Sequence, residues 1–560
     1  MNEESSRRQK LRAALGRHGF IRDRKITDAH RYTGKVTAAG REISLALEFA
    51  DLEFTSLPTA ELLSPETEAP NVVAHLFASG GLCFARREDV VLDRYDVEGT
   101  ALLCLELARQ GVERALTRKR VQEEISAEFP QHWQGHNFFY DLLGRQNEEV
   151  RIYQVPREYG GLFQLVTHNT RTVEGMSPSA RATAVAKKNS VKAHVVNTDR
   201  ALTFGSTQRP PANAGAFLEW IADYTGQSRE TLCEIMSRSY PDTMPIFVTA
   251  PNGCVGITVE LTNSIRKQAP RAIALKRLLE RGNVPVLRYA GLAVDENAIY
   301  GRNMTTEKPM LGKRIALIGC GAIGGHLAHL LIHAGAGHGG GTLYLVDNQV
   351  LSPRNVGRHF LGPIHIGEPK AQAVRGELLR AFPEAGVFAS TDNAISFLPQ
   401  LMGYDLIIDA TGEESLSVTI NEKLMTAKAK EKAPDAIYLR LFGNGAAAQA
   451  LLVDGLKRAC FKCLRPVASG PWRYNPLRKG AALVTEAATC GDGQFLPYAI
   501  PAPVIAASLA VQMALDWSTG APMARLRTNR IDHDSTEEVK TKNPPRAEEC
   551  PCCAKLSMDS

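Results

Sequence analysis

The sequence contains no hydrophobic run approaching the roughly 20 residues that a membrane-spanning helix requires, which argues against a membrane protein. It has no internal repeat and no low-complexity tract, so we expect neither a repeat architecture nor a biased segment. The net charge of +6 over 560 residues is mild and gives no argument for nucleic-acid binding. The N-terminus is basic but lacks the apolar core of a signal peptide, so we interpret it as a mature cytoplasmic start.

What remains is typical of a soluble globular protein, with 44% hydrophobic and 22% charged residues. A chain of 560 residues suggests about two to four domains. The 11 cysteines are unevenly placed, and five of them form two close groups, Cys460/Cys463 and Cys550/Cys552/Cys553. Such grouping favours metal chemistry in a reducing compartment over a disulfide scaffold.

A glycine-rich turn organises the C-terminal half. The apolar run 315–318 predicts a short buried strand, a helical pattern follows, and Gly319, Gly321 and Gly324 lie between them in G-x-G-x-x-G spacing. Glycine lets the backbone approach a phosphate closely, and the helix start offers free N–H groups. A second predicted strand ends in Asp347, about twenty residues on, where a carboxylate would bond ribose hydroxyls. This much fits any Rossmann-type dinucleotide site, including that of an NAD dehydrogenase.

Polar and cationic side chains after Asp347 favour a triphosphate instead. Asn355, Arg358 and Lys370 fall within one turn-and-helix segment, and a hydride-transfer domain needs no such cluster; the alternative is solvated surface charge. The run 347–358 resembles the D-x-D-x-V-x-x-S-N-x-x-R segment of the ubiquitin-activating and ThiF/MoeB-type adenylyltransferases. The resemblance implies ATP-dependent adenylation of the C-terminal carboxylate of a small ubiquitin-like protein. It assigns Asp347 to the ribose and the other three residues to the phosphates.

Two further residues follow from this resemblance. A predicted strand ends at Asp409 and opens into a helix, a plausible place for Mg²⁺ near the phosphates. The family's D-x-T-D-N would place aspartate and asparagine at the positions of Gly412 and Glu413, so Mg²⁺ could be held by Asp409, by Glu413 or through water. The family also has an arginine, matched here by Arg302, that reaches the phosphates of the partner protomer's site. This implies a homodimer; the alternative is an ordinary surface arginine.

Two C-x-x-C knuckles, Cys460/Cys463 and Cys550/Cys553, supply four thiolates that suit a closed tetrahedral zinc site. Such a structural zinc would pin the C-terminal tail to the adenylation domain, and a similar pair occurs in the family. The alternative is a redox or free-thiol role. We expect Cys552 to be a spectator.

Cys490 lies in a polar, glycine-containing loop before an apolar helix predicted from about residue 503 to 517. The family's activating cysteine lies on a crossover loop before the same helix, and the segment from Cys490 to Tyr498 resembles a bacterial fusion form. The resemblance therefore implies that Cys490 is the first thioester site. We expect Cys320, inside the glycine turn, to pack rather than react.

The N-terminal region predicts an antiparallel meander, with strands near 32–36, 42–49 and 52–57, followed by helices near 97–110 and 118–129. The segment from Ala74 to Cys83 resembles the active-site loop of ubiquitin-conjugating enzymes, although alanine stands at 74 where that loop has proline. The resemblance implies a thioester on Cys83, a role that needs little beyond an exposed thiolate. The alternative is a small buried core residue, which is the role we expect for Cys104.

These observations predict an α/β protein of three domains. They are an α+β ubiquitin-conjugating-like domain (1–148), an α/β linker domain (149–305) and a Rossmann-like, doubly wound adenylation domain with a zinc-bound tail (306–560). The implied reaction uses ATP and Mg²⁺, forms a thioester on Cys490, passes the acyl group to Cys83 and conjugates it to an acceptor amine. Two alternatives stay open: a sulfur-carrier adenylyltransferase with a non-catalytic N-terminal binding domain, and a degenerate nucleotide-binding scaffold.

Overall fold

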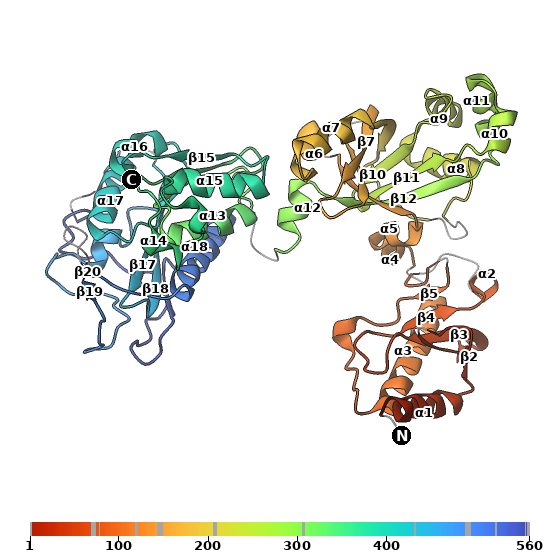
Figure 1. Cartoon of the computed structure of the whole chain (residues 1–560), viewed down its shortest axis with the longest axis horizontal. Helices are drawn as coiled ribbons and strands as arrows, with labels where there is room; N and C mark the ends of the chain where they lie inside the picture. Colours follow the sequence, from red (N-terminus) through yellow and green to blue (C-terminus); the bar gives the residue numbers. More distant parts are fainter. Residues whose placement is uncertain are drawn as a thin grey trace. The chain divides into compact units, whose positions relative to one another are not determined.

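The computed structural model describes residues 3–27, 29–68, 74–77, 79–117, 121–142, 149–204, 210–304, 309–430, 433–487, 494–520, 523–554 and 556. Contacts divide the chain into two units, residues 1–294 and 295–560, and each is described by itself. Figure 1 labels the helices and strands of both units. Within the described ranges, no helix combines the length and apolarity needed to span a bilayer.

The N-terminal part of the first unit is an antiparallel sheet packed on helices. The order β1-β2-β3-β4-β5 confirms the predicted meander. Its third strand was misplaced, however: residues 52–57 form no strand, because the Asp51 side chain accepts the backbone N–H groups of Glu53 and Thr55 and turns the chain there. The elements are α1 (Glu3–Gly16), β1 (Ile21–Arg22), β2 (His30–Ala38), β3 (Arg41–Phe49), β4 (Thr59–Leu62), α2 (Pro65–Glu68), β5 (Gly81–Leu82), η1 (Arg87–Asp89) and α3 (Val97–Thr117).

The remainder of the first unit is built around a closed barrel in the order β10-β11-β12-β6-β8-β7-β9. The barrel includes β6, which precedes the domain boundary that we predict at residue 148. Its strands are β6 (His136–Asp141), β7 (Glu149–Pro156), β8 (Leu162–Thr167), β9 (Val191–Asn197), β10 (Ile246–Ala250), β11 (Gly253–Val259) and β12 (Val286–Ala293). The associated helices are α4 (Val121–Ala127), α5 (Phe129–Trp133), α6 (Thr170–Met176), α7 (Ala180–Lys188), α8 (Ala214–Thr225), α9 (Arg229–Ser237), α10 (Asn263–Gln268) and α11 (Ala272–Arg281).

The second unit contains the predicted doubly wound sheet, in the order β15-β14-β13-β16-β17-β18-β21. The first five strands in that order are parallel to one another. Strand β18 runs antiparallel to β17, and β21 runs antiparallel to β18. The strands are β13 (Arg314–Ile318), β14 (Thr342–Val346), β15 (Val387–Ser390), β16 (Leu406–Asp409), β17 (Asp435–Phe442), β18 (Ala447–Val453) and β21 (Leu526–Arg530); β19 (Glu486–Ala487) and β20 (Gln494–Phe495) form a separate pair.

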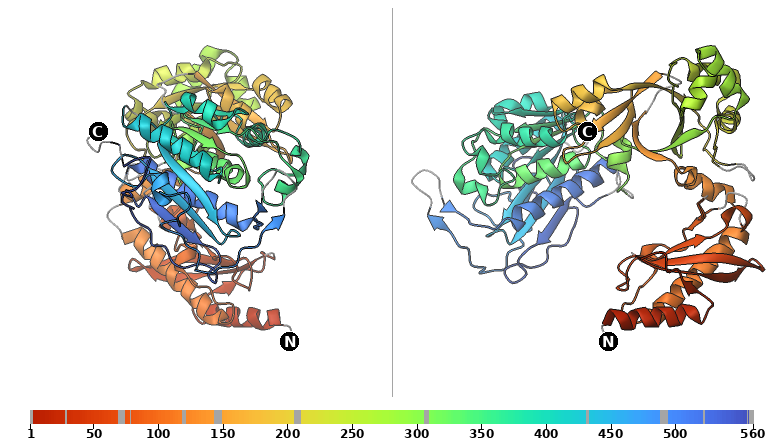
Figure 2. Two further views of the ribbon diagram at one scale, coloured as in Figure 1. Left: turned by 90° about the vertical axis from the view of Figure 1, so that its left-hand side faces the viewer. Right: turned by 45° about the vertical axis from the view of Figure 1, so that its right-hand side comes forward.

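Helices cover both faces of this sheet (Figure 2). On one face, α13 (Ala322–His333), α15 (Lys370–Ala381) and α18 (Pro501–Thr519) share a buried apolar core with the strands. On the other face, α16 (Ala394–Leu401) and α17 (Glu414–Lys428) do the same. Shorter elements are α12 (Glu296–Gly301), α14 (Pro353–Val356), η2 (Pro363–His365) and η3 (Phe461–Leu464). In sheets of this kind ligands bind at the carboxyl ends of the strands, where the strand order reverses. Here the reversal falls between β13 and β16.

Candidate active sites and metal centre

A cavity of about 510 Å³ opens at the carboxyl ends of the parallel strands, at the reversal point. Each strand contributes to it through the residues that directly follow it or end it. The lining includes Gly319 and Gly321, Asp347 to Gln349, Asp392 and Asn393, Thr411 to Glu413, Leu441, Gly443, Leu496 and Tyr498. Sequence reasoning had anticipated Gly319, Gly321, Asp347 and Glu413. It missed Asp392, although the rule that ligands bind after parallel strands points to the residues that follow β15.

The glycine turn is built by close backbone approaches. Gly319 has φ of +88°, and a Cβ there would lie 2.9 Å from the backbone nitrogen of Thr411. A Cβ on Gly324 would lie 1.8 Å from the carbonyl oxygen of Gly319. Asp347 Oδ2 accepts the Cys320 N–H at 2.7 Å, which ties β14 to the turn. Cys320 is fully buried, as expected for a packing residue.

Replacing Gly324 with alanine should therefore displace the turn. The overlap involves backbone atoms that cannot rotate away, so we expect the free energy of unfolding to fall by about 3 kcal/mol. The matched control is Gly376→Ala in α15, where a Cβ meets nothing within 4 Å. That change should leave stability equal or raised by up to about 1 kcal/mol, since alanine is the better helix former. Chemical denaturation of both variants tests this, and equal stabilities would contradict it.

The three predicted phosphate ligands do not line the cavity themselves, and each contacts a neighbouring residue. Lys370 is buried, and its Nζ donates to Oε1 of the lining residue Gln349 at 2.7 Å. The Arg358 guanidinium lies 5.0 Å from the ring centroid of the lining residue Tyr498. Asn355 instead accepts the Ser352 N–H at 3.2 Å as part of the capping box of α14. Two cations thus lie directly behind lining residues, while the Asn355 side chain is used in the cap.

Asp409 is buried behind the cavity lining. Its Oδ1 accepts the Thr411 hydroxyl at 2.7 Å and the Thr411 N–H at 3.0 Å. Burial raises the pKa of the carboxyl, and hydrogen bonds from Ser417 and Thr411 oppose that shift. Asp347, Asp392 and Glu413 line the cavity itself. Oxygen ligands of this kind fit Mg²⁺, which usually takes one or two carboxylates together with substrate phosphates.

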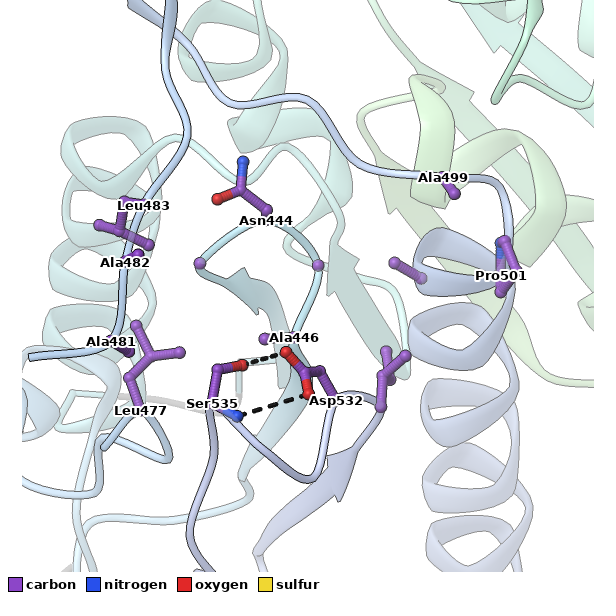
Figure 3. A pocket seen from close by; sticks show the side chains of 14 residues that line it. Asn444, Ala446, Leu477, Ala481, Ala482, Leu483, Ala499, Pro501, Asp532 and Ser535 are labelled. Atoms are coloured by element: carbon purple, nitrogen blue, oxygen red, sulfur yellow. Dashed lines mark hydrogen bonds between the residues drawn. The ribbon is translucent and has the colours of Figure 1, made fainter. Parts of the chain in front are cut away.

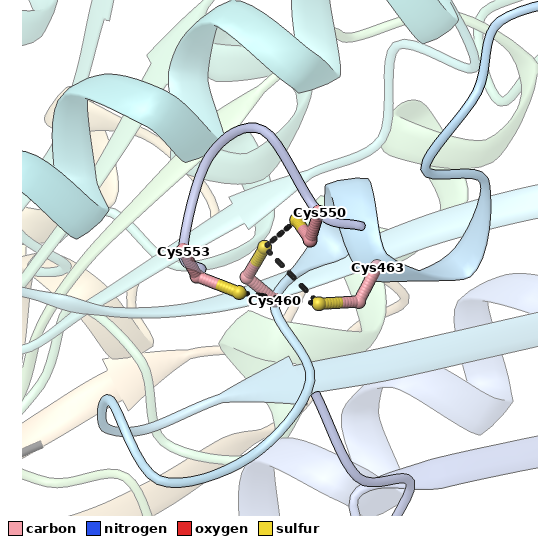
Figure 4. A group of neighbouring side chains, drawn as sticks. All are labelled: Cys460, Cys463, Cys550 and Cys553. Carbon is pink, nitrogen blue, oxygen red and sulfur yellow. Dashed lines mark hydrogen bonds between the residues drawn. The ribbon is translucent and has the colours of Figure 1, made fainter. Parts of the chain in front are cut away.

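Four buried cysteines gather into one cluster in the second unit (Figure 4). Their sulfur atoms all lie within 4.8 Å of one another, with Cys460 Sγ 3.8 Å from Cys463 Sγ and 3.7 Å from Cys550 Sγ. A zinc ion with bonds of about 2.3 Å to four tetrahedral sulfurs places them about 3.8 Å apart. Cys552 lies outside the set: its Sγ accepts a hydrogen bond from Asn421 Nδ2 at 3.2 Å. The residues therefore fit a structural zinc site.

Cys83 follows β5 and is exposed, unlike Cys104, which is fully buried in α3. Burial raises the pKa of the Cys104 thiol to about 11, in agreement with a packing role. Burial, then the charge of Glu128, raise the pKa of Cys83, while the charge of Arg86 lowers it. Cys490 lies outside the described residues.

Comparison with known proteins agrees with this arrangement. Residues 9–138 match the model of prokaryotic E2 family B, and residues 304–552 match that of the ThiF family. An ATP-dependent ubiquitin transferase-like protein Cap2 of Pseudomonas aeruginosa is 32% identical over 520 residues, covering 90% of each chain. The chain belongs to the Cap2 family. Proteins of the same name from Escherichia coli and Vibrio cholerae are 26% and 25% identical, covering 93% and 89% of this chain and 93% and 90% of their own lengths.

The chain is thus a Cap2-like fusion of a prokaryotic E2 region with a ThiF adenylation domain, as the sequence predicted. It is an ATP-dependent ubiquitin transferase-like enzyme. The two family matches leave residues 139–303 outside them, and these residues form most of the barrel.

Arg302 directly follows α12, which is anchored at the amino ends of the parallel strands of the second unit. The Tyr300 hydroxyl lies 2.8 Å from His338 Nε2, and Glu296 Oε2 accepts the Gly339 N–H at 2.8 Å. His338 and Gly339 lead into the start of β14, whereas the nucleotide cavity lies at the carboxyl ends of the strands. Arg302 is therefore at the opposite edge of the sheet from its own cavity.

A second cavity, of about 240 Å³, adjoins the first in the ThiF-type domain and shares Gly443 with it. Figure 3 shows its labelled side chains, drawn from the β17–β18 turn, the segment 477–483, the start of α18 and the segment after β21. The lining is mostly small and apolar. Asn444 fixes its upper wall, because Nδ2 donates to the carbonyl oxygens of Val484 at 2.8 Å and Pro497 at 2.9 Å.

Proposed function

We propose that this chain uses ATP and Mg²⁺ to adenylate the C-terminal carboxylate of a small ubiquitin-like protein. The acyl group then passes to Cys490, next to Cys83, and finally to an acceptor amine. The observation that carries the proposal is the exposure of Cys83: it alone is exposed among the cysteines of the described ranges, and it lies in the E2-like region of a chain that also has an adenylation domain.

Each step is a substitution at phosphorus or carbon. The carboxylate attacks the α-phosphorus of ATP and pyrophosphate leaves, which converts an inert carboxylate into a mixed anhydride. A cysteine thiolate then attacks the acyl carbon and AMP leaves, giving a thioester that an amine can attack. An amine attacks a thioester far more readily than a free carboxylate, and the free energy of ATP cleavage drives formation of that thioester.

The adenylation cavity has groups suited to these substrates. Asp347 would hold the ribose, and Lys370 and Arg358 would neutralise phosphate charge once their bonds to lining residues rearrange. Asp392 and Glu413 are further candidates to hold Mg²⁺, which would shield the phosphate charge. The adjoining small-residue cavity suits the narrow C-terminal tail of the acyl donor, since the two cavities meet at Gly443. Arg302, remote from its own cavity, would act on a partner protomer's site in a homodimer.

Intact-mass spectrometry tests the relay. The full chain is incubated with ATP, Mg²⁺ and the small protein encoded beside its gene, with and without thiol reductant. We expect a reductant-sensitive adduct that maps to Cys490 and Cys83. In a Cys490→Ala variant, loading of Cys83 should fall below detection; loading that persists would overturn the relay. An adduct on Cys490 alone would support a sulfur-carrier adenylyltransferase.

Replacing Lys370 with methionine should slow ATP-dependent loading of Cys490 about 10–100-fold, because one charge-assisted contact to phosphate contributes roughly 1.5–3 kcal/mol. The matched control is Lys423→Met, an exposed lysine on α17. Initial rates of thioester formation at saturating ATP provide the measurement. A rate for Lys370→Met equal to that of the control would remove Lys370 from the phosphate site.

A further inference from the structure

Cys83 lies on a short hairpin that places one histidine directly opposite it. Leu76 and Leu82 form an antiparallel bridge, and the Cys83 N–H donates to the His75 carbonyl at 2.8 Å. Side chains of successive residues alternate between the two faces of such a ladder, and directly opposite residues share a face. Leu76 and Leu82 are buried, whereas the Cys83 side chain is exposed and that of His75 is partly exposed.

The backbone of His75 is in an uncommon conformation. Its φ of +63° lies in the left-handed region, which non-glycine residues rarely adopt. Strain of this kind persists where surrounding structure imposes it, and it gathers at functional sites. Here the imposing structure is the hairpin on one side and α4 and α5 on the other.

Acidic side chains from α4 and the residue before α5 surround the imidazole. Glu128 Oε2 lies 3.3 Å from His75 Nδ1, and Glu124 Oε2 lies 3.9 Å from His75 Nε2. Glu128 Oε2 is also 3.7 Å from Nε2 of His132, but burial lowers the pKa of His132 to about 4, so that ring is neutral at physiological pH. Arg86 is the cation whose charge acts on Cys83 from its own loop. Glu128 therefore contacts the His75 ring, and its charge also acts on Cys83.

We propose that His75, oriented and electrostatically supported by Glu128, accepts the proton of the amine that attacks the acyl group on Cys83. This inference rests on the proposed function. The amine nitrogen forms a bond to the acyl carbon, the carbon–sulfur bond breaks, and the Cys83 sulfur takes the electron pair. The nitrogen loses one proton to His75, whose imidazolium is stabilised by Glu128 and can then protonate the departing sulfur.

The arrangement meets the requirements for this role. Histidine is the side chain best suited to exchange protons near neutral pH. A sulfur whose protonated form is favoured by burial and by a neighbouring carboxylate leaves more easily when a proton donor is at hand. In this scheme Glu128 touches neither substrate nor sulfur and is a positioning residue, whereas His75 is the group that meets the reacting amine.

The test compares discharge of the Cys83 thioester to a nucleophile that needs a base with discharge to one that does not. Cys83 of the full chain, in a Cys490→Ala background, is loaded from a fluorescent glycine-ended peptide supplied as its 2-mercaptoethanesulfonate thioester. Discharge is then followed in single turnover with free lysine and with hydroxylamine, which reacts without assistance. We expect His75→Gln and Glu128→Gln to slow discharge to lysine about 10–100-fold and to change discharge to hydroxylamine less than about threefold. The matched control is Glu123→Gln, an exposed glutamate on α4.

The outcomes distinguish this inference from the function on which it rests. If the unaltered chain forms no thioester on Cys83, the proposed function fails. If the thioester forms and His75→Gln discharges to lysine at the unaltered rate, the base assignment is overturned. Equal slowing with both nucleophiles would mean that His75 only shapes the hairpin, which also overturns it. Circular dichroism and thermal unfolding equal to those of the unaltered chain show that each variant is folded.

Discussion

Replacing Cys83 with alanine is expected to eliminate conjugate formation while leaving the ATP-dependent thioester on Cys490 intact. The reason is that the acyl group would have no second sulfur to reach, and no other described cysteine is exposed. The thiol side chain is exposed, so its removal should cost little stability. Conjugates are measured on reducing gels, where amide products survive, and the Cys490 adduct by intact mass. We expect at least a 1,000-fold loss of conjugate, on the order of the effect of removing a catalytic nucleophile.

Two further variants serve as controls for the Cys83→Ala result. Cys104→Ala removes a thiol from the same domain at a buried position and should retain conjugation, with at most a modest loss of stability. Cys83→Ser should accumulate an adduct that resists thiol reductant, because an oxygen ester replaces the thioester. Full conjugation by Cys83→Ala would mean that the N-terminal region binds a partner without reacting, as in the sulfur-carrier alternative.

The adenylation domain was the part of the fold most accessible from sequence. Its central strands are short, mostly buried apolar runs that alternate with helices, so local pattern and tertiary structure agree. The strand predicted at 315–318 is β13, and the helical pattern predicted after the glycine turn is α13. The cysteine cluster was likewise predictable, because two C-x-x-C knuckles restrict the possible ligands to few residues.

Other features depend on long-range pairing that local pattern does not reveal. The barrel joins β6 to β12 and β8, which are distant or non-adjacent in sequence, so an α/β linker domain was all that could be predicted. The alternation at 52–57 reflects burial of Leu52 and Phe54 within a turn rather than a strand. The cavity position of Asp392 and the contact of His75 with Glu128 could not be predicted, because local sequence does not show which loops lie side by side in the fold. The roles of Cys490, Arg302 and the phosphate-binding residues stay predictions.

Removing one ligand of the cysteine cluster should destabilise the second unit severely. Apparent binding of structural zinc contributes roughly 10–16 kcal/mol, comparable to the whole stability of a typical domain of about 5–15 kcal/mol. The cluster joins the segment after β18 to the C-terminal tail, since Cys463 Sγ lies 3.2 Å from Cys553 Sγ. We therefore expect Cys553→Ser to lose bound zinc and to lower the melting temperature of this unit by more than about 10 °C.

The neighbouring residue supplies the control. Cys552→Ser alters a thiol in the same knuckle that contacts Asn421 and interacts with Cys460 but is not one of the four clustered cysteines. It should retain one zinc per chain and melt within about 3 °C of the unaltered protein. Elemental analysis and calorimetry measure both quantities. Adenylation should fail in Cys553→Ser even though the cluster contributes no residue to the nucleotide cavity, because η3 packs on α17, whose preceding residue Glu413 lines that cavity. Zinc content and melting equal to those of Cys552→Ser would instead assign the four thiols to redox chemistry.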